Sequence, residues 1–181
     1  MELILNKYTP GQVAKASKIK AVVFDVDGVL TGGEIIYSNT GDELKQFNVK
    51  DGLIIKHLKN HGILTGAITG RTSQLVQKRC EELKLDFFYQ GARDKWMILK
   101  KEIDQLDLKD HETCYIGDDL IDLKSLVRVG LSVSPSDAPG YIKDHVDLVA
   151  SCKGGQGVVR EVADLVLASQ GALKQIVKEC L

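Results

Sequence analysis

The chain has 181 residues, of which 44% are hydrophobic and 27% are charged, and its formal net charge is −1. This length suits one well-filled hydrophobic core and is short for two domains. The even charge balance argues against nucleic acid as a partner, and no apolar run approaches the roughly 20 residues of a membrane-spanning helix.

Apolar strand-like runs alternate with helical patterns from residue 18 onward, so residues 1–17 are expected to form an N-terminal appendage. The first strand is predicted over 21–26. Segments 34–38 and 44–49 enclose a turn with Asn39 and Gly41, which predicts a β-hairpin flap over about 33–48. A helix is then predicted over 51–60, and Gly62 ends it.

The rest of the chain repeats this alternation. The predicted strands are 63–69, 86–90, 113–117, 130–134 and 146–150, and the predicted helices are 72–84, 94–106, 119–127, 138–143 and 156–168. Strands separated by helices need crossover connections, which place helices on both faces of a parallel sheet. The sequence therefore predicts a single α/β domain over 18–170 with a Rossmann-like parallel sheet, followed by a helical tail over 171–181.

Polar side chains stand at or just beyond the ends of several predicted strands. Open parallel sheets bind ligands beyond the carboxyl ends of their strands, so these side chains are candidates for one site. In chain order they are Asp25, Asp27, Thr69, Arg71, Lys95, Asp118, Asp119 and Asp122. The sequence thus predicts that carboxylates, one hydroxyl group and cations meet at one edge of the sheet.

The clustered carboxylates indicate a hard divalent cation. Asp25 and Asp27 are two residues apart and point to the same side of an extended chain. Bringing Asp118 beside them is repulsive unless a cation intervenes, and all-oxygen ligands suit Mg²⁺. One carboxylate can then attack phosphorus while the other protonates the leaving alcohol and later activates water. Lys95 and Thr69 are suited to bind the remaining phosphate oxygens.

Each motif has a simpler interpretation when taken alone. An isolated Asp-x-Asp is more often a turn, a single lysine is usually solvated, and Gly-Asp-Asp is often a helix cap. The order of the motifs and their positions at strand ends favour the catalytic interpretation.

In these residues the sequence resembles the haloacid dehalogenase superfamily of aspartyl-phosphate phosphotransferases. The four motifs of that superfamily match DVDGVLT, ITGR, the lysine of ARDKW and GDDLID. The resemblance implies that Asp25 is the nucleophile and a metal ligand. It implies that Asp27 is the acid/base and gives the metal its backbone carbonyl. Thr69 and Lys95 would bind phosphate, and Asp118 would ligate Mg²⁺. The same resemblance gives an orienting or water-mediated role to Asp119 and Asp122.

The spacing of the motifs leaves no room for a cap domain. Only 43 residues separate Asp25 from Thr69, and 25 separate Thr69 from Lys95. The hairpin, two helices and one strand fill these intervals. A site that must exclude water needs other cover, so we expect the hairpin and a neighbouring subunit to provide it. The sequence therefore predicts a homo-oligomer.

The segments GDELKQFNVKDG, YQG, VGLSVS and GGQGVVREV resemble the 3-deoxy-D-manno-octulosonate 8-phosphate (KDO 8-phosphate) phosphatase family, a capless branch of the superfamily. The resemblance implies a Mg²⁺-dependent homotetramer that acts on this acidic sugar phosphate in lipopolysaccharide synthesis. It assigns substrate contacts, besides Asp27 and Lys95, to Asn48, Val49, Lys50, Asp51, Gly52, Lys56, Arg71 and Arg79. The family more often has arginine at positions 50 and 56, where lysine keeps the charge but loses bidentate geometry.

Other interpretations remain open at this point. A sister phosphatase acting on the nine-carbon 2-keto-3-deoxynononate 9-phosphate is the main alternative, and a catalytically silent binding module on the same fold is another. Lys56 and Arg79 also suit plain surface roles. The four cysteines form no CxxC pair and the N-terminus lacks the apolar core of a signal peptide, so we expect a reduced, cytoplasmic protein.

Overall fold

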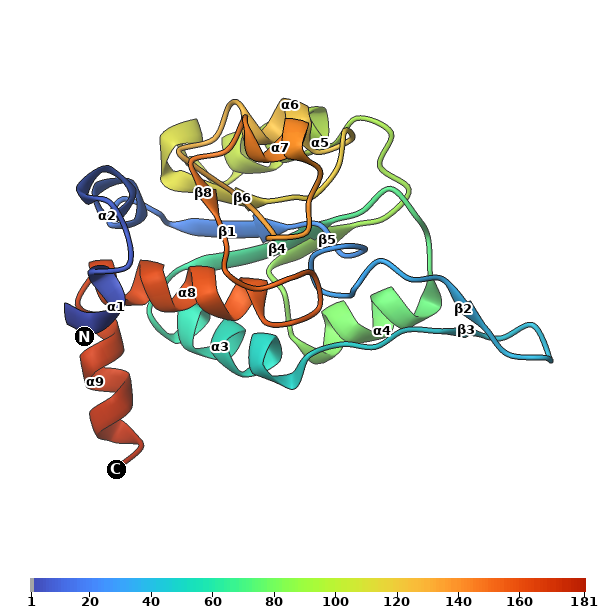
Figure 1. Ribbon diagram of the computed structural model, residues 1–181, viewed down its shortest axis with the longest axis horizontal. Coiled ribbons are helices and arrows are strands. Elements are labelled where there is room, and N and C mark those ends of the chain that lie inside the picture. The colour runs from blue at the N-terminus through green and yellow to red at the C-terminus, as the bar shows by residue number, and fades with distance from the viewer. Residues whose placement is uncertain (1) are drawn as a thin grey trace.

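The computed structural model describes residues 2–181, with side chains from residue 4, and is built around a six-stranded parallel sheet (Figure 1). The strands lie in the order β5-β4-β1-β6-β7-β8. Their bounds are β1 (Ala21–Phe24), β4 (Leu64–Ile68), β5 (Phe87–Tyr89), β6 (Thr113–Ile116), β7 (Leu131–Ser134) and β8 (Leu148–Val149). All pairings are parallel, which confirms the predicted α/β class.

Helices cover both faces of this sheet, as Figure 1 shows. One face carries α3 (Val49–Asn60), α4 (Gln74–Glu82) and α8 (Val158–Ser169), and the other carries α5 (Lys95–Gln105), α6 (Leu123–Leu126) and α7 (Gly140–Lys143). Alternate β1 side chains enter the two resulting cores. Val22 and Phe24 pack in the core that includes α3 and α8, whereas Ala21 and Val23 pack in the core that includes α5. Burial on both faces explains why this strand is continuously apolar.

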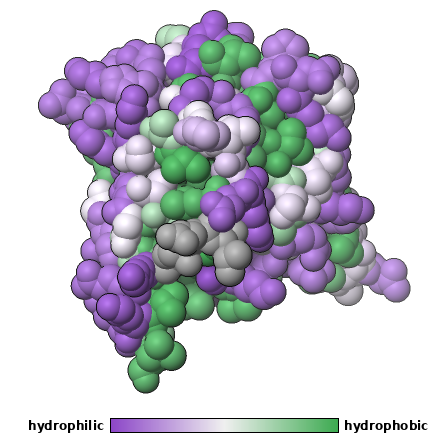
Figure 2. Space-filling model, turned by 60° about the vertical axis from the view of Figure 1, so that its left-hand side comes forward, coloured by the Kyte–Doolittle hydropathy of each residue, from purple (hydrophilic) through white to green (hydrophobic). Residues whose placement is uncertain are grey.

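The segment before β1 packs on the domain. It contains α1 (Glu2–Leu5) and α2 (Pro10–Ala16), both of which contact α8, and Ala16 is fully buried in the main core. The tail helix α9 (Ala172–Glu179) also packs on α8, through the buried Leu173 and Ile176. Figure 2 shows this side of the molecule, where a mostly hydrophilic surface is interrupted by separate hydrophobic areas.

The hairpin forms where the sequence predicts it, but its strands are shorter. β2 (Ile36–Tyr37) and β3 (Glu43–Leu44) pair antiparallel and extend away from the body of the molecule (Figure 1). A two-stranded ribbon has no further strand to pair with, which limits its length. Within the described residues, β2 and β3 pair only with each other.

Some helix starts differ from the predicted ones for local reasons. α3 begins before residue 51 because the Asn48 side chain caps it by accepting from the Lys50 backbone N–H at 2.9 Å. The helix predicted over 119–127 begins only at Leu123, since residues 119–122 form a turn. A short 3₁₀ helix (Asp110–Glu112) precedes β6. None of the helices in the described chain combines the length and apolarity needed to cross a membrane.

Candidate active site at the carboxyl edge of the sheet

The loop after β1 places two carboxylates at the edge of the sheet. Asp25 is buried, and its Oδ1 accepts a hydrogen bond from the Val26 backbone N–H at 2.7 Å. The Val26 carbonyl then accepts from the Thr31 hydroxyl at 3.3 Å, which closes the loop. Gly28 has φ +90°, and a Cβ at this position would overlap the Asp118 carboxylate. Glycine therefore lets the loops after β1 and β6 approach each other closely.

Lys95 is buried and pairs with two acidic side chains. Asp94 caps α5 by accepting from the Met97 backbone N–H at 3.2 Å, so Lys95 is the first residue of that helix. The buried Lys95 ammonium is 2.7 Å from Asp25 Oδ2 and 2.7 Å from Asp122 Oδ1. Burial opposes its charged form, but the Asp25 and Asp122 carboxylates outweigh this and raise the pKa of Lys95.

Asp122 organises the loop after β6. Its Oδ1 accepts from Lys95 and from the Tyr115 hydroxyl, both at 2.7 Å. Its Oδ2 accepts from the backbone N–H groups of Asp118 at 3.2 Å and Asp119 at 3.3 Å. Both carboxylate oxygens of Asp122 thus already accept hydrogen bonds from protein donors, so this side chain fixes the positions of Lys95 and of the loop after β6. The Asp119 side chain instead accepts from the Leu120 backbone N–H at 2.7 Å.

The acidic cluster suits a divalent cation. Carboxylate oxygens of Asp25, Asp118 and Asp122 lie within 4.8 Å of one another. Asp118 Oδ1 and Asp27 Oδ2 are buried and have no hydrogen-bond partner within the described residues. Burial, followed by the charges of neighbouring carboxylates, raises the pKa of both Asp25 and Asp118 to about 7. An all-oxygen donor set with an unsatisfied acidic charge fits Mg²⁺.

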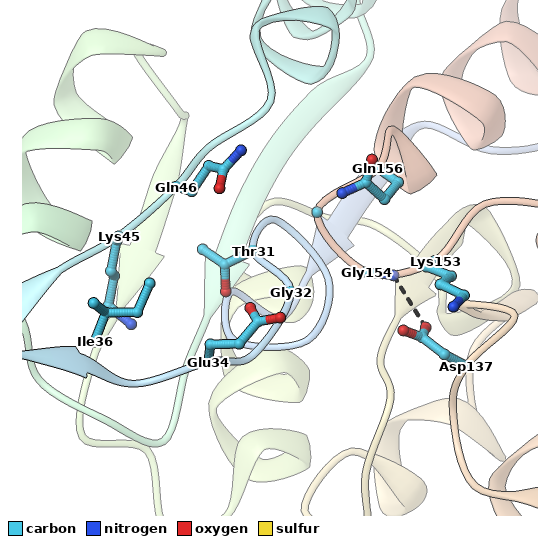
Figure 3. Close-up of a pocket in the computed structure, with 11 residues that line it drawn as sticks. Thr31, Gly32, Glu34, Ile36, Lys45, Gln46, Asp137, Lys153, Gly154 and Gln156 are labelled. Atoms are coloured by element: carbon cyan, nitrogen blue, oxygen red, sulfur yellow. Dashed lines mark hydrogen bonds between the residues drawn. The ribbon is translucent and has the colours of Figure 1, made fainter.

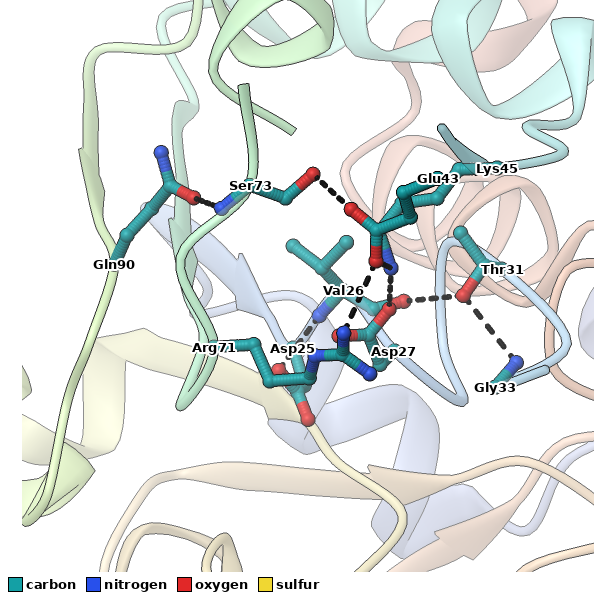
Figure 4. Close-up of polar contacts among 10 residues, drawn as sticks. All are labelled: Asp25, Val26, Asp27, Thr31, Gly33, Glu43, Lys45, Arg71, Ser73 and Gln90. Carbon is teal, nitrogen blue, oxygen red and sulfur yellow. Dashed lines mark hydrogen bonds and ion pairs between the residues drawn. The ribbon is translucent and has the colours of Figure 1, made fainter. Parts of the chain in front are cut away.

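The hairpin brings a second polar cluster to the same edge. The Lys45 ammonium, from the chain just after β3, pairs with Asp27 Oδ1 (Figure 4). Glu43 in β3 pairs with Arg71 at 3.1 Å and accepts from the Ser73 hydroxyl at 2.7 Å (Figure 4). The contacts of Lys45, Glu43 and Ser73 were not predicted from the sequence. A feature of the sequence that could have indicated them is the two-residue spacing of Glu43 and Lys45, which points both side chains to the same side of a strand.

One small cavity gathers most of the predicted catalytic residues. It has a volume of about 240 Å³ and is lined by Asp25, Asp27, Gly33, Thr69, Gly70, Arg71, Asp118, Asp119 and Ile121. A larger hollow of about 420 Å³ lies between the base of the hairpin and the loop at 153–156 (Figure 3). A third, of about 360 Å³, shares Gly33 and Asp118 with the first and Glu34 and Asp137 with the second. The cavity that contains Asp25, called the catalytic cavity below, is therefore continuous with the hollows at the base of the hairpin.

Several of the predicted sugar-binding residues lie elsewhere. Asp51 is only 1% exposed, and its Oδ1 accepts from the Arg160 backbone N–H at 2.8 Å, which caps the start of α8. The Arg79 guanidinium lies over the Phe47 ring and donates to the Asn48 carbonyl at 3.4 Å. Gly52 is packed under Arg79, since a Cβ there would be 2.8 Å from its Nη2. Together with the exposed Val49, Lys50 and Lys56, these residues are not among those lining the catalytic cavity.

Comparisons with known proteins agree with the geometry. No protein-family model matches the chain. The 3-deoxy-D-manno-octulosonate 8-phosphate phosphatase KdsC of Escherichia coli (strain K12) is 41% identical over 163 residues, which are 90% of this chain and 87% of that protein.

Solved structures give the same result. The 3-deoxy-D-manno-octulosonate 8-phosphate phosphatase from Moraxella catarrhalis, in complex with magnesium ion, phosphate ion and a KDO molecule, matches with a TM-score of 0.93 at 36% identity, covering 96% of this chain and 100% of that one. The Yersinia pestis enzyme of the same name matches with a TM-score of 0.89 at 39% identity, covering 91% of this chain and 89% of that one. The resemblance seen in the motifs is thereby confirmed, and the chain belongs to the 3-deoxy-D-manno-octulosonate 8-phosphate phosphatase family of the haloacid dehalogenase superfamily.

Proposed function

We propose that the chain hydrolyses 3-deoxy-D-manno-octulosonate 8-phosphate to the free sugar acid and phosphate, as a Mg²⁺-dependent step of lipopolysaccharide synthesis. The observation that carries this is the buried Asp25–Lys95–Asp122 cluster beside Asp118, which lies at the strand ends of a chain 41% identical to a phosphatase of that name. The presence of Arg71 in the same cavity suits a substrate with a second anionic group.

The first chemical step uses Asp25 as nucleophile. Its carboxylate oxygen attacks phosphorus, and the bond between phosphorus and the sugar oxygen breaks. Asp27 donates a proton to that oxygen, so that the sugar leaves as an alcohol. Lys95 and Thr69 hold the phosphate oxygens, and the covalent product is an aspartyl-phosphate on Asp25.

The second step returns the enzyme to its starting state. Asp27, now a carboxylate, takes a proton from water, and the water oxygen attacks phosphorus. The bond to Asp25 breaks, which releases phosphate and restores the Asp25 carboxylate. Asp25, Asp118 and the Asp27 carbonyl would hold Mg²⁺, which neutralises the phosphate charge when bound. Asp122 orients the loop through its four hydrogen bonds, and Asp119 acts through water.

The substrate's sugar is proposed to contact Arg71 within the chain and further residues across a subunit boundary. Five of them lie in α3 or cap it, one lies in α4, and all are outside the lining of the cavity that contains Asp25: they are Asn48, Val49, Lys50, Gly52, Lys56 and Arg79. Asp51 would act on them indirectly, because it is buried against α8. A contribution from a neighbouring subunit reconciles the family resemblance with these positions.

A homotetramer is proposed for the same reason. The hairpin exposes Ile35, Ile36, Tyr37 and Leu44, with exposed fractions between 45% and 64%. Apolar side chains on a projecting ribbon favour burial against another subunit, which would also cover the catalytic cavity. Light scattering tests the assembly.

A cytoplasmic location is proposed as well, and the four cysteines are free, as a reducing compartment requires.

The function is tested by measuring phosphate release from eight- and nine-carbon 2-keto acid phosphates and from simple sugar phosphates. We expect the eight-carbon acid to be preferred and EDTA to abolish turnover, with recovery on adding Mg²⁺. Preference for the nine-carbon acid would transfer the assignment to the sister activity. Turnover that survives EDTA would contradict the metal assignment.

A further inference from the structure

Lys45 reaches the site from the hairpin and pairs with Asp27, the residue that serves as acid and base in the proposed function. We propose that Lys45 is the positioning residue of Asp27: its ammonium group holds Oδ1, so that Oδ2 is the oxygen that carries the transferred proton. This inference rests on the proposed function and adds the group that orients its acid and base.

The Asp27 carboxylate has a single polar partner within the described residues. Its Oδ1 accepts from the Lys45 ammonium (Figure 4), and its Oδ2 is buried without a hydrogen-bond partner. The Asp25 carboxylate, by contrast, is fixed by the Val26 backbone N–H and by Lys95, both at 2.7 Å. The direction of the Asp27 side chain therefore depends on Lys45.

The burial of Lys45 shows that this contact is part of the folded structure. Its side chain is 2% exposed, although the preceding Leu44 is 53% exposed and Ile36, which pairs with Leu44, is 45% exposed. Lysine is rarely buried unless its charge is paired. The two partners are Asp27 and Glu43, whose Oε1 lies 3.7 Å from the ammonium. A hairpin lysine that only kept the ribbon soluble would instead extend into water.

Glu43 fixes the hairpin beside Lys45. Its Oε2 accepts from the Ser73 hydroxyl at 2.7 Å, and its Oε1 lies 3.1 Å from an Arg71 guanidinium nitrogen (Figure 4). These contacts tie β3 to the segment between β4 and α4. Lys45 directly follows β3, so the residue that holds Asp27 comes from a segment that is itself anchored.

One occupied oxygen leaves Asp27 a single site for the proton. The Lys45 ammonium only donates, so the proton of a protonated Asp27 resides on Oδ2. In the first step this proton passes to the ester oxygen as the phosphorus–oxygen bond breaks, and in the second step Oδ2 takes a proton from the attacking water. Asp27 lines the cavity that contains Asp25, so a fixed orientation keeps Oδ2 beside the reacting phosphorus in both steps.

Two classes of phosphate ester distinguish the positioning of an acid from a general loss of structure. A sugar phosphate releases an alcohol and needs the proton from Asp27, whereas 4-nitrophenyl phosphate releases a stable phenolate that leaves without one. Breakdown of the aspartyl-phosphate is the same for both esters. A misdirected Asp27 therefore slows release of the leaving group from the sugar phosphate alone.

The test measures release of the leaving group in a single turnover, with the full-length protein and Mg²⁺ in excess over 3-deoxy-D-manno-octulosonate 8-phosphate or 4-nitrophenyl phosphate. We expect Lys45→Met to slow release of the sugar acid by about 10- to 100-fold, because a misplaced catalytic group loses up to about 10²-fold in rate. Release of nitrophenolate should slow by less than about 3-fold, since it needs no acid. The enzyme concentration that gives half the maximal rate should stay unchanged for both esters.

Asp42→Asn is the control for a change of charge in the hairpin. Asp42 accepts from the hydroxyl groups of Ser38 and Thr40, away from Asp27. This variant should keep the wild-type ratio between the two release rates.

The inference is overturned if Lys45→Met slows release equally from both esters, since Lys45 would then only anchor the hairpin, or if it slows neither. It is also overturned if the half-saturating concentration rises for the sugar phosphate at an unchanged maximal rate, since Lys45 would then bind the substrate. Should Lys45→Met not fold, Lys45→Arg takes its place, because its planar cation holds a carboxylate in a different geometry. The same selective slowing is expected, and equal slowing refutes the role.

Failure of the proposed function would look different. In that case the wild type would not hydrolyse the eight-carbon ester, and a pentose 5-phosphate, which also releases an alcohol, replaces it in the same comparison of variants. Selective slowing of the pentose phosphate by Lys45→Met still supports the positioning role. A wild type that hydrolyses 4-nitrophenyl phosphate but neither sugar phosphate overturns it, because Asp27 would then not act as an acid, and hydrolysis of none of the three esters overturns both proposals.

Discussion

Replacing Lys95 with methionine should destabilise the protein strongly, apart from any loss of activity. The Lys95 ammonium is buried and lies 2.7 Å from each of two buried carboxylates, those of Asp25 and Asp122. Removing it leaves both without their cation in a region of low dielectric. Breaking a buried ion pair in this way costs about 3–5 kcal/mol. For a protein of this size, each kcal/mol lowers Tm by roughly 2–4 °C, so a fall of about 6–20 °C is expected.

The assay is thermal unfolding followed by circular dichroism, with Lys124→Met as a matched control. Lys124 pairs with Asp94 at 2.6 Å, but its side chain is 65% exposed. Pairs of this kind contribute about 1 kcal/mol or less, so the control should change Tm by only about 4 °C or less. Adding Mg²⁺ should restore part of the lost stability of Lys95→Met, because a cation near Asp25 compensates one of the two carboxylates. The reasoning is refuted if both variants lower Tm equally.

Three further substitutions follow from the structure. Asp25→Asn should abolish phosphate release while lowering Tm less than Lys95→Met does, because Lys95 keeps its buried ion pair with Asp122; substantial turnover by this variant would contradict the aspartyl-phosphate mechanism. Gly28→Ala should lower kcat and weaken Mg²⁺ binding in calorimetry, since its Cβ would meet the Asp118 carboxylate; unchanged metal affinity would show that the loops have room to move. Asp51→Asn should stabilise the protein above pH 6, because burial raises the pKa of Asp51 to about 6, from an ordinary value of 3.8. The pKa of Asp51 is thus higher in the folded protein than in the unfolded chain. Its contribution to the free energy of unfolding is therefore fully present at low pH and is lost as pH rises through about 4 to 6, by up to about 3 kcal/mol. The gain in Tm should therefore be larger at pH 8 than at pH 4, and equal gains would refute the assignment.

The sequence alone determined the sheet and the catalytic motifs. Continuous apolar runs such as 21–24 and the helical patterns between them are local signals, because backbone periodicity and burial act over a few residues. Parallel strands end at one edge, so the meeting of Asp25, Thr69 and Asp118 followed from their places at or just beyond the carboxyl ends of predicted strands. The resemblance to a known family followed from the same motifs, and the comparisons confirmed it.

The packing of the peripheral helices could be seen only in the folded chain. α1 and α2 are too short to be stable alone, and they form against α8, which lies far away in the sequence. Asp51 was predicted as a sugar contact from its motif, but packing of α3 on α8 buries it as a cap for the Arg160 backbone N–H. No local pattern distinguishes an exposed acidic residue in a first helical turn from one that caps a second helix.

Only the tertiary structure decided the polar contacts that complete the site. Lys45 reaches Asp27, Glu43 reaches Arg71 and Ser73, and Asp122 joins Lys95 to the loop after β6. Each contact depends on the orientation of the hairpin or on the position of α5 relative to the sheet. Both are set by packing across the whole core. Side chains 18 to 30 residues apart in sequence therefore meet for reasons that no short stretch of the chain contains.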